Sequence, residues 1–151
     1  MRVELRYDRM GGRLIGIGNI EIRYDMMGGR PRWLGGTELR YDRMGGRLVG
    51  IGNTEIRYDM MGGRPRWLGG TELHYDRMGG RLVGIGNTEI RYDMMGGRPR
   101  QVGDIGINYN RLGGRPKDLT RESDASLTYE ELMIMFFVLY LTLFVQSRNS
   151  T

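Results

Sequence analysis

Apolar and polar residues alternate in short runs along residues 1–117, and glycines separate one run from the next. Residues 38–42 (Glu-Leu-Arg-Tyr-Asp) and 47–51 (Arg-Leu-Val-Gly-Ile) are typical of these runs. Alternation over about five residues between glycine turns predicts β-strands that bury one face. The frequent Gly-Gly and Gly-Asn pairs would interrupt any helix, so a helical repeat array is excluded.

The pattern recurs with a period of 17 residues, and a Tyr-Asp pair marks each copy. The pairs are Tyr7-Asp8, Tyr24-Asp25, Tyr41-Asp42, Tyr58-Asp59, Tyr75-Asp76 and Tyr92-Asp93, followed by Tyr109-Asn110 in the last copy. Two versions of the unit alternate, ELRYDRMGGRLVGIGNT and EIRYDMMGGRPRWLGGT, so the duplicated segment is 34 residues long. Since each copy holds two predicted strands, residues 1–117 are expected to form a seven-copy array of β-hairpins.

The turns indicate that neighbouring strands pair in an antiparallel meander. Gly52-Asn53 and its equivalents suit two-residue hairpin turns with positive φ, which would place Ile51 opposite Thr54. Each strand would then pair with the next one along the chain. The pattern does not decide whether such a sheet stays open or closes.

The longer loop at residues 42–46 sets the remaining register. It would place Tyr41 opposite Arg47 and Leu39 opposite Val49, which predicts one face with a row of apolar residues and a ladder of alternating tyrosine and arginine. An arginine over a tyrosine ring adds about 0.5–1 kcal/mol when exposed. The predicted ladder residues are Tyr41, Arg47, Tyr58, Arg64, Tyr75, Arg81, Tyr92 and Arg98. The other face is predicted to be solvated, and it would carry Leu48 and Pro65 among charged residues.

The alternative architecture is a β-solenoid with one copy per coil. Identical residues would then stack along the rod, and glutamates on glutamates would destabilise it. We therefore prefer the meander. Pro31, Pro65 and Pro99 lack a backbone donor, so we expect β-bulges or weak pairing at these positions in both architectures.

The string Tyr-Asp-x-x-Gly-x-Arg-Leu, at residues 41–48 and again at 75–82, resembles the YD repeat of RHS-type proteins. The resemblance extends over residues 7 to about 115. It implies β-hairpins, which in that family form a large shell around cargo, and it implies a role without catalysis. Seven copies are too few for such a shell.

The composition changes after a polar linker, residues 118–128. Thr128 and Glu131 have the spacing of a capping box, and the apolar run Leu132–Val145 follows. These features predict a hydrophobic helix at residues 129–147, apolar on all sides. The run is shorter than a usual membrane span. We expect it to pack on the apolar face of the sheet or against a second copy, with tail anchoring in a membrane as the alternative.

Charge and composition narrow the choice of partners. The formal charge is +5, and Lys117 is the only lysine. Arginine suits fixed, stacked pairs, whereas nucleic-acid binding would need a clustered basic stripe, so we expect no nucleic-acid partner. The first residues lack the apolar stretch of a secretory signal, which favours a cytoplasmic location, with membrane association through the helix as the alternative.

Few residues suggest catalysis or ligand chemistry. The chain has no cysteine, and its single histidine, His74, stands where an equivalent copy has Arg40. The repeated acidic residues lack the singular environment that a catalytic carboxylate needs. Gly50-Ile51-Gly52 precedes a strand rather than a helix, which argues against a dinucleotide loop. We therefore expect no enzyme, no cofactor and no metal site.

Methionine pairs recur in the longer loops, at residues 26–27, 60–61 and 94–95. Thioethers are ligands that Cu(I) prefers, but we interpret these side chains as caps on the edge of the sheet.

Trp33 and Trp67 are the candidate contact residues, because the register places them on the polar face, where a sugar ring or a partner protein could stack. The expected function is a non-enzymatic structural or protein-interaction module that binds a partner protein or itself. The alternatives are a membrane-tethered scaffold and a glycan-binding surface protein.

Overall fold

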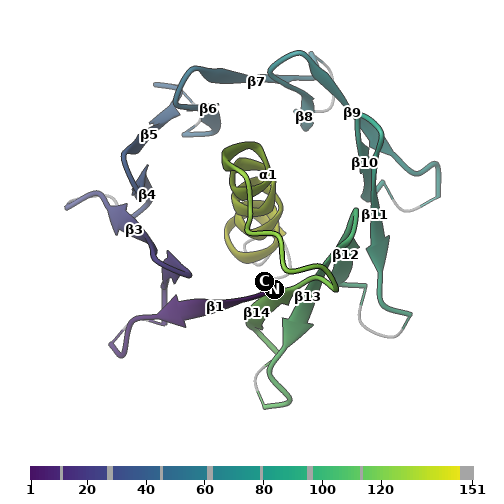
Figure 1. Cartoon of the computed structure of the whole chain (residues 1–151). Coiled ribbons are helices and arrows are strands. Elements are labelled where there is room, and N and C mark those ends of the chain that lie inside the picture. The colour runs from purple at the N-terminus through teal and green to yellow at the C-terminus, as the bar shows by residue number, and fades with distance from the viewer. Residues whose placement is uncertain are drawn as a thin grey trace.

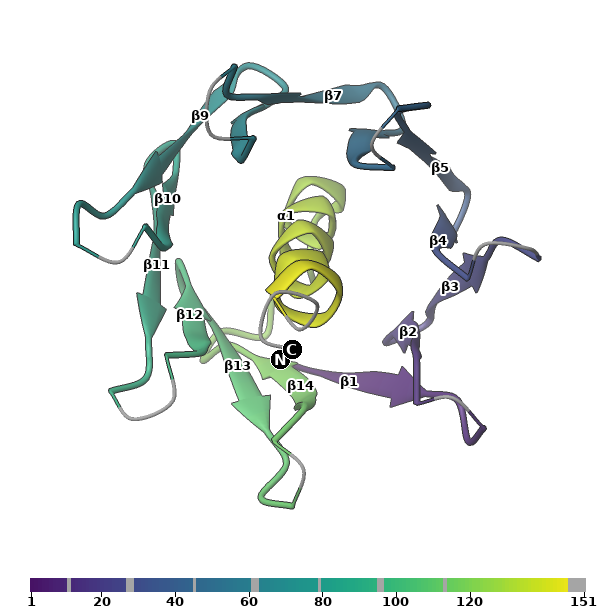
Figure 2. The same ribbon diagram turned by 180° about the vertical axis from the view of Figure 1, so that it is seen from behind.

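The computed structural model describes residues 1–146 except residues 11, 27, 28, 45, 61, 62, 79, 95, 96 and 113. Fourteen antiparallel strands form a sheet that closes on itself, and the C-terminal helix lies inside it (Figures 1 and 2). Each strand pairs with the next along the chain, and β1 pairs with β14. The mainly β, antiparallel hairpin prediction is confirmed, and the solenoid is wrong. The meander closes into a barrel, which the repeat pattern did not predict.

The strands are four to six residues long, and their bounds repeat with the sequence. They are β1 (Arg2–Tyr7), β2 (Leu14–Ile17), β3 (Ile20–Tyr24), β4 (Pro31–Leu34), β5 (Thr37–Tyr41), β6 (Leu48–Ile51), β7 (Thr54–Tyr58), β8 (Pro65–Leu68), β9 (Thr71–Tyr75), β10 (Leu82–Ile85), β11 (Thr88–Tyr92), β12 (Pro99–Val102), β13 (Ile105–Tyr109) and β14 (Pro116–Thr120).

The seam between β1 and β14 closes the barrel. Arg2 lies opposite Thr120 in the register, and its Nη2 is 2.8 Å from Oδ2 of Asp118, a carboxylate that is only 2% exposed. Asn108 donates a further hydrogen bond to Oδ1 of Asp118 at 2.8 Å. β14 thus includes the first three residues of the predicted linker 118–128. Closure pairs the outer strands, which would otherwise be unpaired edges that attract other chains.

A β-bulge sets the register between β5 and β6. Leu39 lies opposite Ile51 and Tyr41 opposite Leu48, so Val49 is the extra residue. A bulge of this kind changes which side chains face inward. It allows Leu48 and Ile51, three residues apart, both to be buried in the lumen of the barrel.

The predicted register of the longer loop is therefore wrong, both for Tyr41 with Arg47 and for Leu39 with Val49. Leu48 and Pro65, predicted on the solvated face, are buried. The corresponding bulge occurs at all seven strand pairs that flank the longer loops. It is present opposite leucine as well as proline, so the proline is not its cause.

The two-residue turns are formed as predicted, with Ile51 opposite Thr54. Gly52 has a φ of +60°, and among the described residues only glycines have positive φ. Positive φ at the first central residue alone is the pattern of a type II′ turn, which matches the twist of a hairpin.

The C-terminal segment forms α1 (Tyr129–Tyr140), an α-helix, and continues as η1 (Leu141–Gln146), a π-helix. The predicted capping box between Thr128 and Glu131 is present. Arg121 directly follows β14, and its Nη2 lies 2.6 Å from Oε1 of Glu131. This ion pair connects the first turn of α1 to the barrel. The hydrogen bond from the Thr128 backbone, and then Arg121, lower the pKa of Glu131.

The lumen explains why this helix is apolar on every side. Its buried residues occupy nearly consecutive positions: Met133, Met135, Phe136, Phe137, Val138 and Leu139. They form one core cluster with the inward leucines, isoleucines and valine of the strands. The apolar run therefore packs on the apolar face of the sheet, as we expected. It does so from inside a closed barrel. In the described part of the chain, no helix is long and apolar enough to cross a membrane.

Candidate functional site

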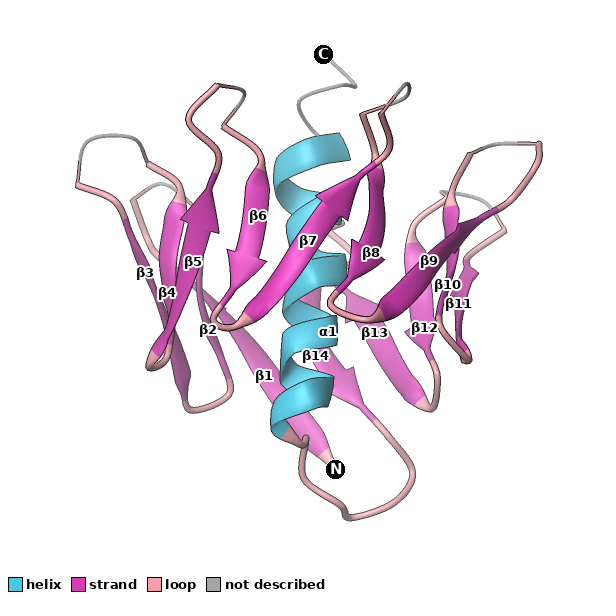
Figure 3. Ribbon diagram, turned by 90° about the horizontal axis from the view of Figure 1, so that it is seen from above, coloured by secondary structure: helices cyan, strands magenta, loops and turns pink. Residues whose placement is uncertain are grey.

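The two ends of the barrel differ. The two-residue turns lie at the end where α1 begins, and the longer loops lie at the end where the helix finishes (Figure 3). We call the described residues of the longer loops the crown; they lie within residues 8–13, 25–30, 42–47, 59–64, 76–81, 93–98 and 110–115. One backbone hydrogen bond closes each loop, for example from Asp42 N–H to the Arg47 carbonyl at 2.9 Å.

Beneath the crown lies a belt of seven half-buried tyrosines. We call Tyr7, Tyr24, Tyr41, Tyr58, Tyr75, Tyr92 and Tyr109 the tyrosine belt. Each phenol donates a hydrogen bond to a backbone carbonyl of the neighbouring copy, such as Tyr58 to Leu48 at 2.6 Å. Inside the belt, the Tyr24 ring lies 6.3 Å from that of Phe144, which stacks on Tyr140 at 5.4 Å. The belt thus joins the crown to the end of the helix.

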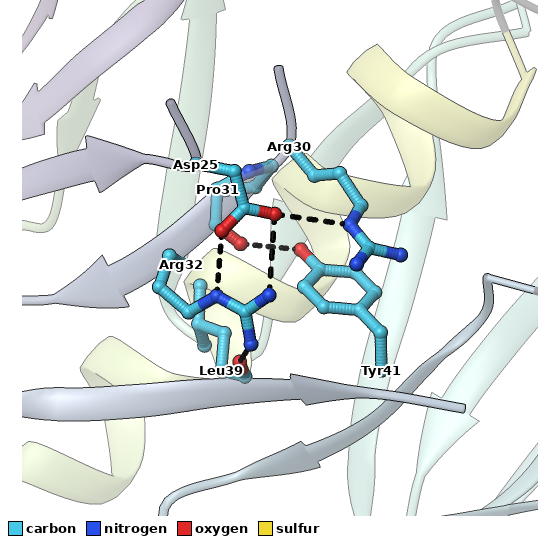
Figure 4. Close-up of polar contacts among 6 residues, drawn as sticks. All are labelled: Asp25, Arg30, Pro31, Arg32, Leu39 and Tyr41. Atoms are coloured by element: carbon cyan, nitrogen blue, oxygen red, sulfur yellow. Dashed lines mark hydrogen bonds and ion pairs between the residues drawn. The ribbon is translucent and has the colours of Figure 1, made fainter. Parts of the chain in front are cut away.

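The guanidinium of an arginine in one copy stacks on the tyrosine ring of the next copy. In the version drawn in Figure 4, Arg30 and Arg32 both bind Asp25, and the Arg30 guanidinium lies 4.2 Å from the centre of the Tyr41 ring. The Tyr41 hydroxyl donates to the Pro31 carbonyl at 2.6 Å. Aspartate, arginine and tyrosine therefore form one unit that crosses from copy to copy. The hydrogen bond from Arg32 is the main cause that lowers the pKa of Asp25.

The arginine and carbonyl contacts of the tyrosine also close the circle at the seam, where Asn110 stands in place of the aspartate. Arg115 of the last copy lies 3.9 Å from the ring of Tyr7 in the first, and Tyr7 donates to the carbonyl of Pro116 at 2.5 Å. All seven tyrosines therefore have both an arginine and a carbonyl partner.

The predicted ladder placed each arginine between two tyrosines, and the structure shows only one of these two contacts: Arg47 lies beside Tyr58, as the ladder implied, but not opposite Tyr41. Arg47 lies over Tyr58, Arg64 over Tyr75, Arg81 over Tyr92 and Arg98 over Tyr109, at 4.0–4.6 Å. Tyr41 is covered by Arg30 and Arg32. The arginines reach the rings from the crown rather than from positions opposite them in the sheet.

Burial raises the pKa of the belt phenols. For Tyr7, Tyr24, Tyr75 and Tyr92 the pKa rises to about 12, and the nearby arginines offset part of this increase. Burial also raises the pKa of Tyr41, Tyr58 and Tyr109. The phenolate is disfavoured because the barrel removes it from water.

We expect the barrel to lose stability as the pH rises from about 10 towards 12. A tyrosine in the unfolded chain ionises near pH 10. Above that pH the unfolded state therefore holds fewer protons than the folded state, and each rise in pH favours unfolding. Absorbance at 295 nm and far-ultraviolet circular dichroism should show phenolate formation and loss of β-structure together. Ionisation of the belt near pH 10 with the sheet intact would contradict this expectation.

The candidate contact residues Trp33 and Trp67 lie on the outer wall of the barrel and are partly buried. Trp33 lies opposite Glu38, and the Arg23 guanidinium is 5.8 Å from its ring. Trp67 has the equivalent neighbours. In the other version of the repeat a glycine takes the place of the tryptophan, and Arg40 lies flat across Gly50 and donates to the Gly52 carbonyl at 2.8 Å.

The residues that could take part in metal or acid–base chemistry are dispersed in the described part of the chain. It contains no group of three or more His, Asp or Glu that could hold a metal ion. His74 is exposed and lies against Gly84, in the place of the Arg40 side chain. Of the methionine pairs, Met26, Met60 and Met94 are fully or almost fully exposed, while Met27, Met61 and Met95 lie outside the described residues.

The most prominent surface feature is an exposed apolar residue among the described residues of every crown loop. These residues are Met10, Met26, Met44, Met60, Met78, Met94 and Leu112, and they are 91–100% exposed. Sequence reasoning interpreted Met26, Met60 and Met94 as caps on the edge of the sheet, which their exposure contradicts, and it did not single out the other four. The signal was present in the sequence, since each longer loop contains a methionine or leucine that no strand can bury.

Comparison with protein families, curated proteins and solved structures found no match to this chain.

Proposed function

We propose that the chain is a non-enzymatic interaction module, a rigid barrel that presents its crown to a partner. The observation that carries the proposal is the apolar residue exposed in each of the seven loops. Single exposed apolar residues are ordinary on a protein surface. Seven of them on one rim, each two or three residues after a tyrosine of the belt, form a repeated contact surface.

The contacts beneath the crown support this role. The aspartate, arginine and tyrosine unit orders the base of six of the seven loops, so that these loops are arranged before any partner binds. Preorganisation lowers the entropy cost of association. The polar residues of the crown base contact one another and the backbone, which leaves the exposed side chains available for a partner.

The experiment compares two variants of the full chain, produced with a purification tag. In the crown-serine variant the seven exposed residues Met10, Met26, Met44, Met60, Met78, Met94 and Leu112 are replaced by serine. In the wall variant only Trp33 and Trp67 are replaced by serine. Protein, lipid and carbohydrate that copurify with each chain are then quantified, together with the thermal unfolding midpoint.

We expect the crown-serine variant to lose copurifying material while it unfolds within a few degrees of the unmodified chain, because exposed substitutions each change stability by about 0.5 kcal/mol or less. The wall variant should retain the material. Loss from neither variant would contradict the proposal.

A glycan-binding outer wall is the second candidate. It is favoured by the repeated arrangement of Trp33 or Trp67 between an arginine and a glutamate, since an aromatic face with flanking polar groups suits a sugar ring. Loss of carbohydrate from the wall variant alone would support this function instead.

A further inference from the structure

The apolar residues of the crown account for most of the exposed large hydrophobic side chains. Among the described residues eight such side chains are exposed, and seven of them belong to the crown; the eighth is Tyr129. They are not scattered over the barrel. Since apolar surface is concentrated where a protein meets another apolar phase, the crown is the face to examine for a partner.

The crown is built to meet a flat surface. Because the sheet closes, its seven loops surround the barrel axis at one end, as Figure 3 shows. The apolar end of the helix lies at the same end, where Leu141, Leu143 and Phe144 are only partly buried. A ring of apolar tips around an apolar centre can contact a planar partner at every loop at once.

The crown also carries the positive charge of the chain. Its loops hold eleven arginines and six aspartates, a formal charge of +5 that equals the charge of the whole protein. Four of these arginines, Arg9, Arg43, Arg77 and Arg111, are exposed and directly precede an exposed methionine or leucine. No ion pair seen within the described residues involves any of the four.

We propose that the crown docks on the surface of a membrane rich in anionic phospholipid. The methionine and leucine side chains enter the boundary between headgroups and acyl chains, and the adjacent arginines bind lipid phosphates. Apolar insertion combined with basic residues is how peripheral proteins bind anionic bilayers. This inference rests on the proposed function, because it names the partner of the same crown.

Two other partners fit the crown less well. Nucleic acid would satisfy the arginines but not the exposed methionines, which carry no charge and donate no hydrogen bond. A second copy bound crown to crown would bury the apolar residues but bring two surfaces of +5 together. An anionic bilayer meets both the apolar and the charged requirement.

The experiment measures cosedimentation of the full chain with vesicles of phosphatidylcholine alone and of phosphatidylcholine with 30% phosphatidylserine, in about 0.1 M salt. The crown-serine variant removes the apolar tips. A crown-glutamine variant carries Arg9→Gln, Arg43→Gln, Arg77→Gln and Arg111→Gln. The matched control removes four exposed arginines from the outer wall, with Arg6→Gln, Arg23→Gln, Arg57→Gln and Arg91→Gln.

We expect the unmodified chain to bind the anionic vesicles. Its binding to vesicles of phosphatidylcholine alone, and the binding of each crown variant to the anionic vesicles, should be at least about tenfold weaker. The control with the same loss of charge should bind within about twofold of the unmodified chain, because its arginines do not face the bilayer. Circular dichroism of every variant confirms that the barrel is folded.

Several outcomes would overturn the inference. Equal binding of the control and the crown-glutamine variant would show attraction by net charge alone. Absence of vesicle binding, with crown-dependent binding to duplex DNA or crown-dependent dimerisation in sedimentation equilibrium, would show another partner; the lipid inference would then fail while the proposed function stands. Absence of vesicle binding together with unchanged copurification by the crown-serine variant would overturn both.

Discussion

Replacing Phe137 by aspartate is expected to abolish the cooperative unfolding of the barrel. Phe137 is 1% exposed and lies in the cluster that fills the lumen. Loss of a buried aromatic side chain costs about 3–5 kcal/mol, and an unpaired buried carboxylate adds several more. Since domains are stable by only about 5–15 kcal/mol, the substitution should remove most of the free energy of unfolding.

The measurement is thermal and denaturant unfolding followed by near-ultraviolet circular dichroism. Leu112→Asp is the matched control, because it also converts an apolar residue into aspartate but at a position that is 91% exposed. The control should change the unfolding free energy by about 0.5 kcal/mol or less. Removal of residues 129–151 should likewise leave an aggregating chain. A well-folded Phe137→Asp protein would show that the helix does not fill the lumen in solution.

The second large effect is expected in the tyrosine belt. Tyr58→Ala and Tyr75→Ala together should lower the unfolding free energy by about 4–6 kcal/mol, because each removes a half-buried aromatic ring and leaves a backbone carbonyl without its donor. The double substitution Glu55→Ala and Glu72→Ala should change it by about 1 kcal/mol or less, since both glutamates are exposed on the outer wall.

Denaturant titration of the two double variants provides the comparison. Tyr58→Phe separates the contributions, since it keeps the ring under Arg47 and removes only the hydrogen bond to Leu48, which should cost about 1 kcal/mol. If the glutamate pair proves more costly than the tyrosine pair, the belt is not what joins one copy to the next.

Both effects arise because the strands of the barrel and the C-terminal helix stabilise each other. The strands are short, and fourteen of them enclose the helix, whose buried side chains form one core cluster with theirs. The helix is apolar on all sides and would not remain exposed in water. Each part buries the surface that the other exposes, and the belt and the seam hold the enclosing sheet around the helix.

Several elements were predictable because they depend on local sequence. Alternating residues between glycines predicted the strands, the Gly-Asn and Gly-Gly pairs predicted the two-residue turns, and Thr128 with Glu131 predicted the start of the helix. The importance of tyrosine and arginine also followed from their recurrence. Their pairing followed in part: Arg47 lies beside Tyr58 as the ladder implied, but Tyr41 does not lie opposite Arg47, because the predicted register assumed regular strands.

The bulge left a trace in the sequence that regular alternation cannot accommodate. Leu48 and Ile51 are three residues apart, as are Pro65 and Leu68, and both members of each pair are buried. In a regular strand, residues with this spacing face opposite sides of the sheet. An extra residue between them is the simplest way to bury both.

The sequence by itself thus determined the strands, the two-residue turns, the helix and the residue types of the belt and crown, because neighbours along the chain specify them. The bulged register left a local trace, the three-residue spacing of buried residues, that the alternation rule did not use. The tertiary structure alone decided the closure of β1 on β14 and the position of the helix in the lumen. These features depend on the accumulated twist and stagger of fourteen strands and on contacts between residues more than a hundred positions apart. No local pattern encodes them.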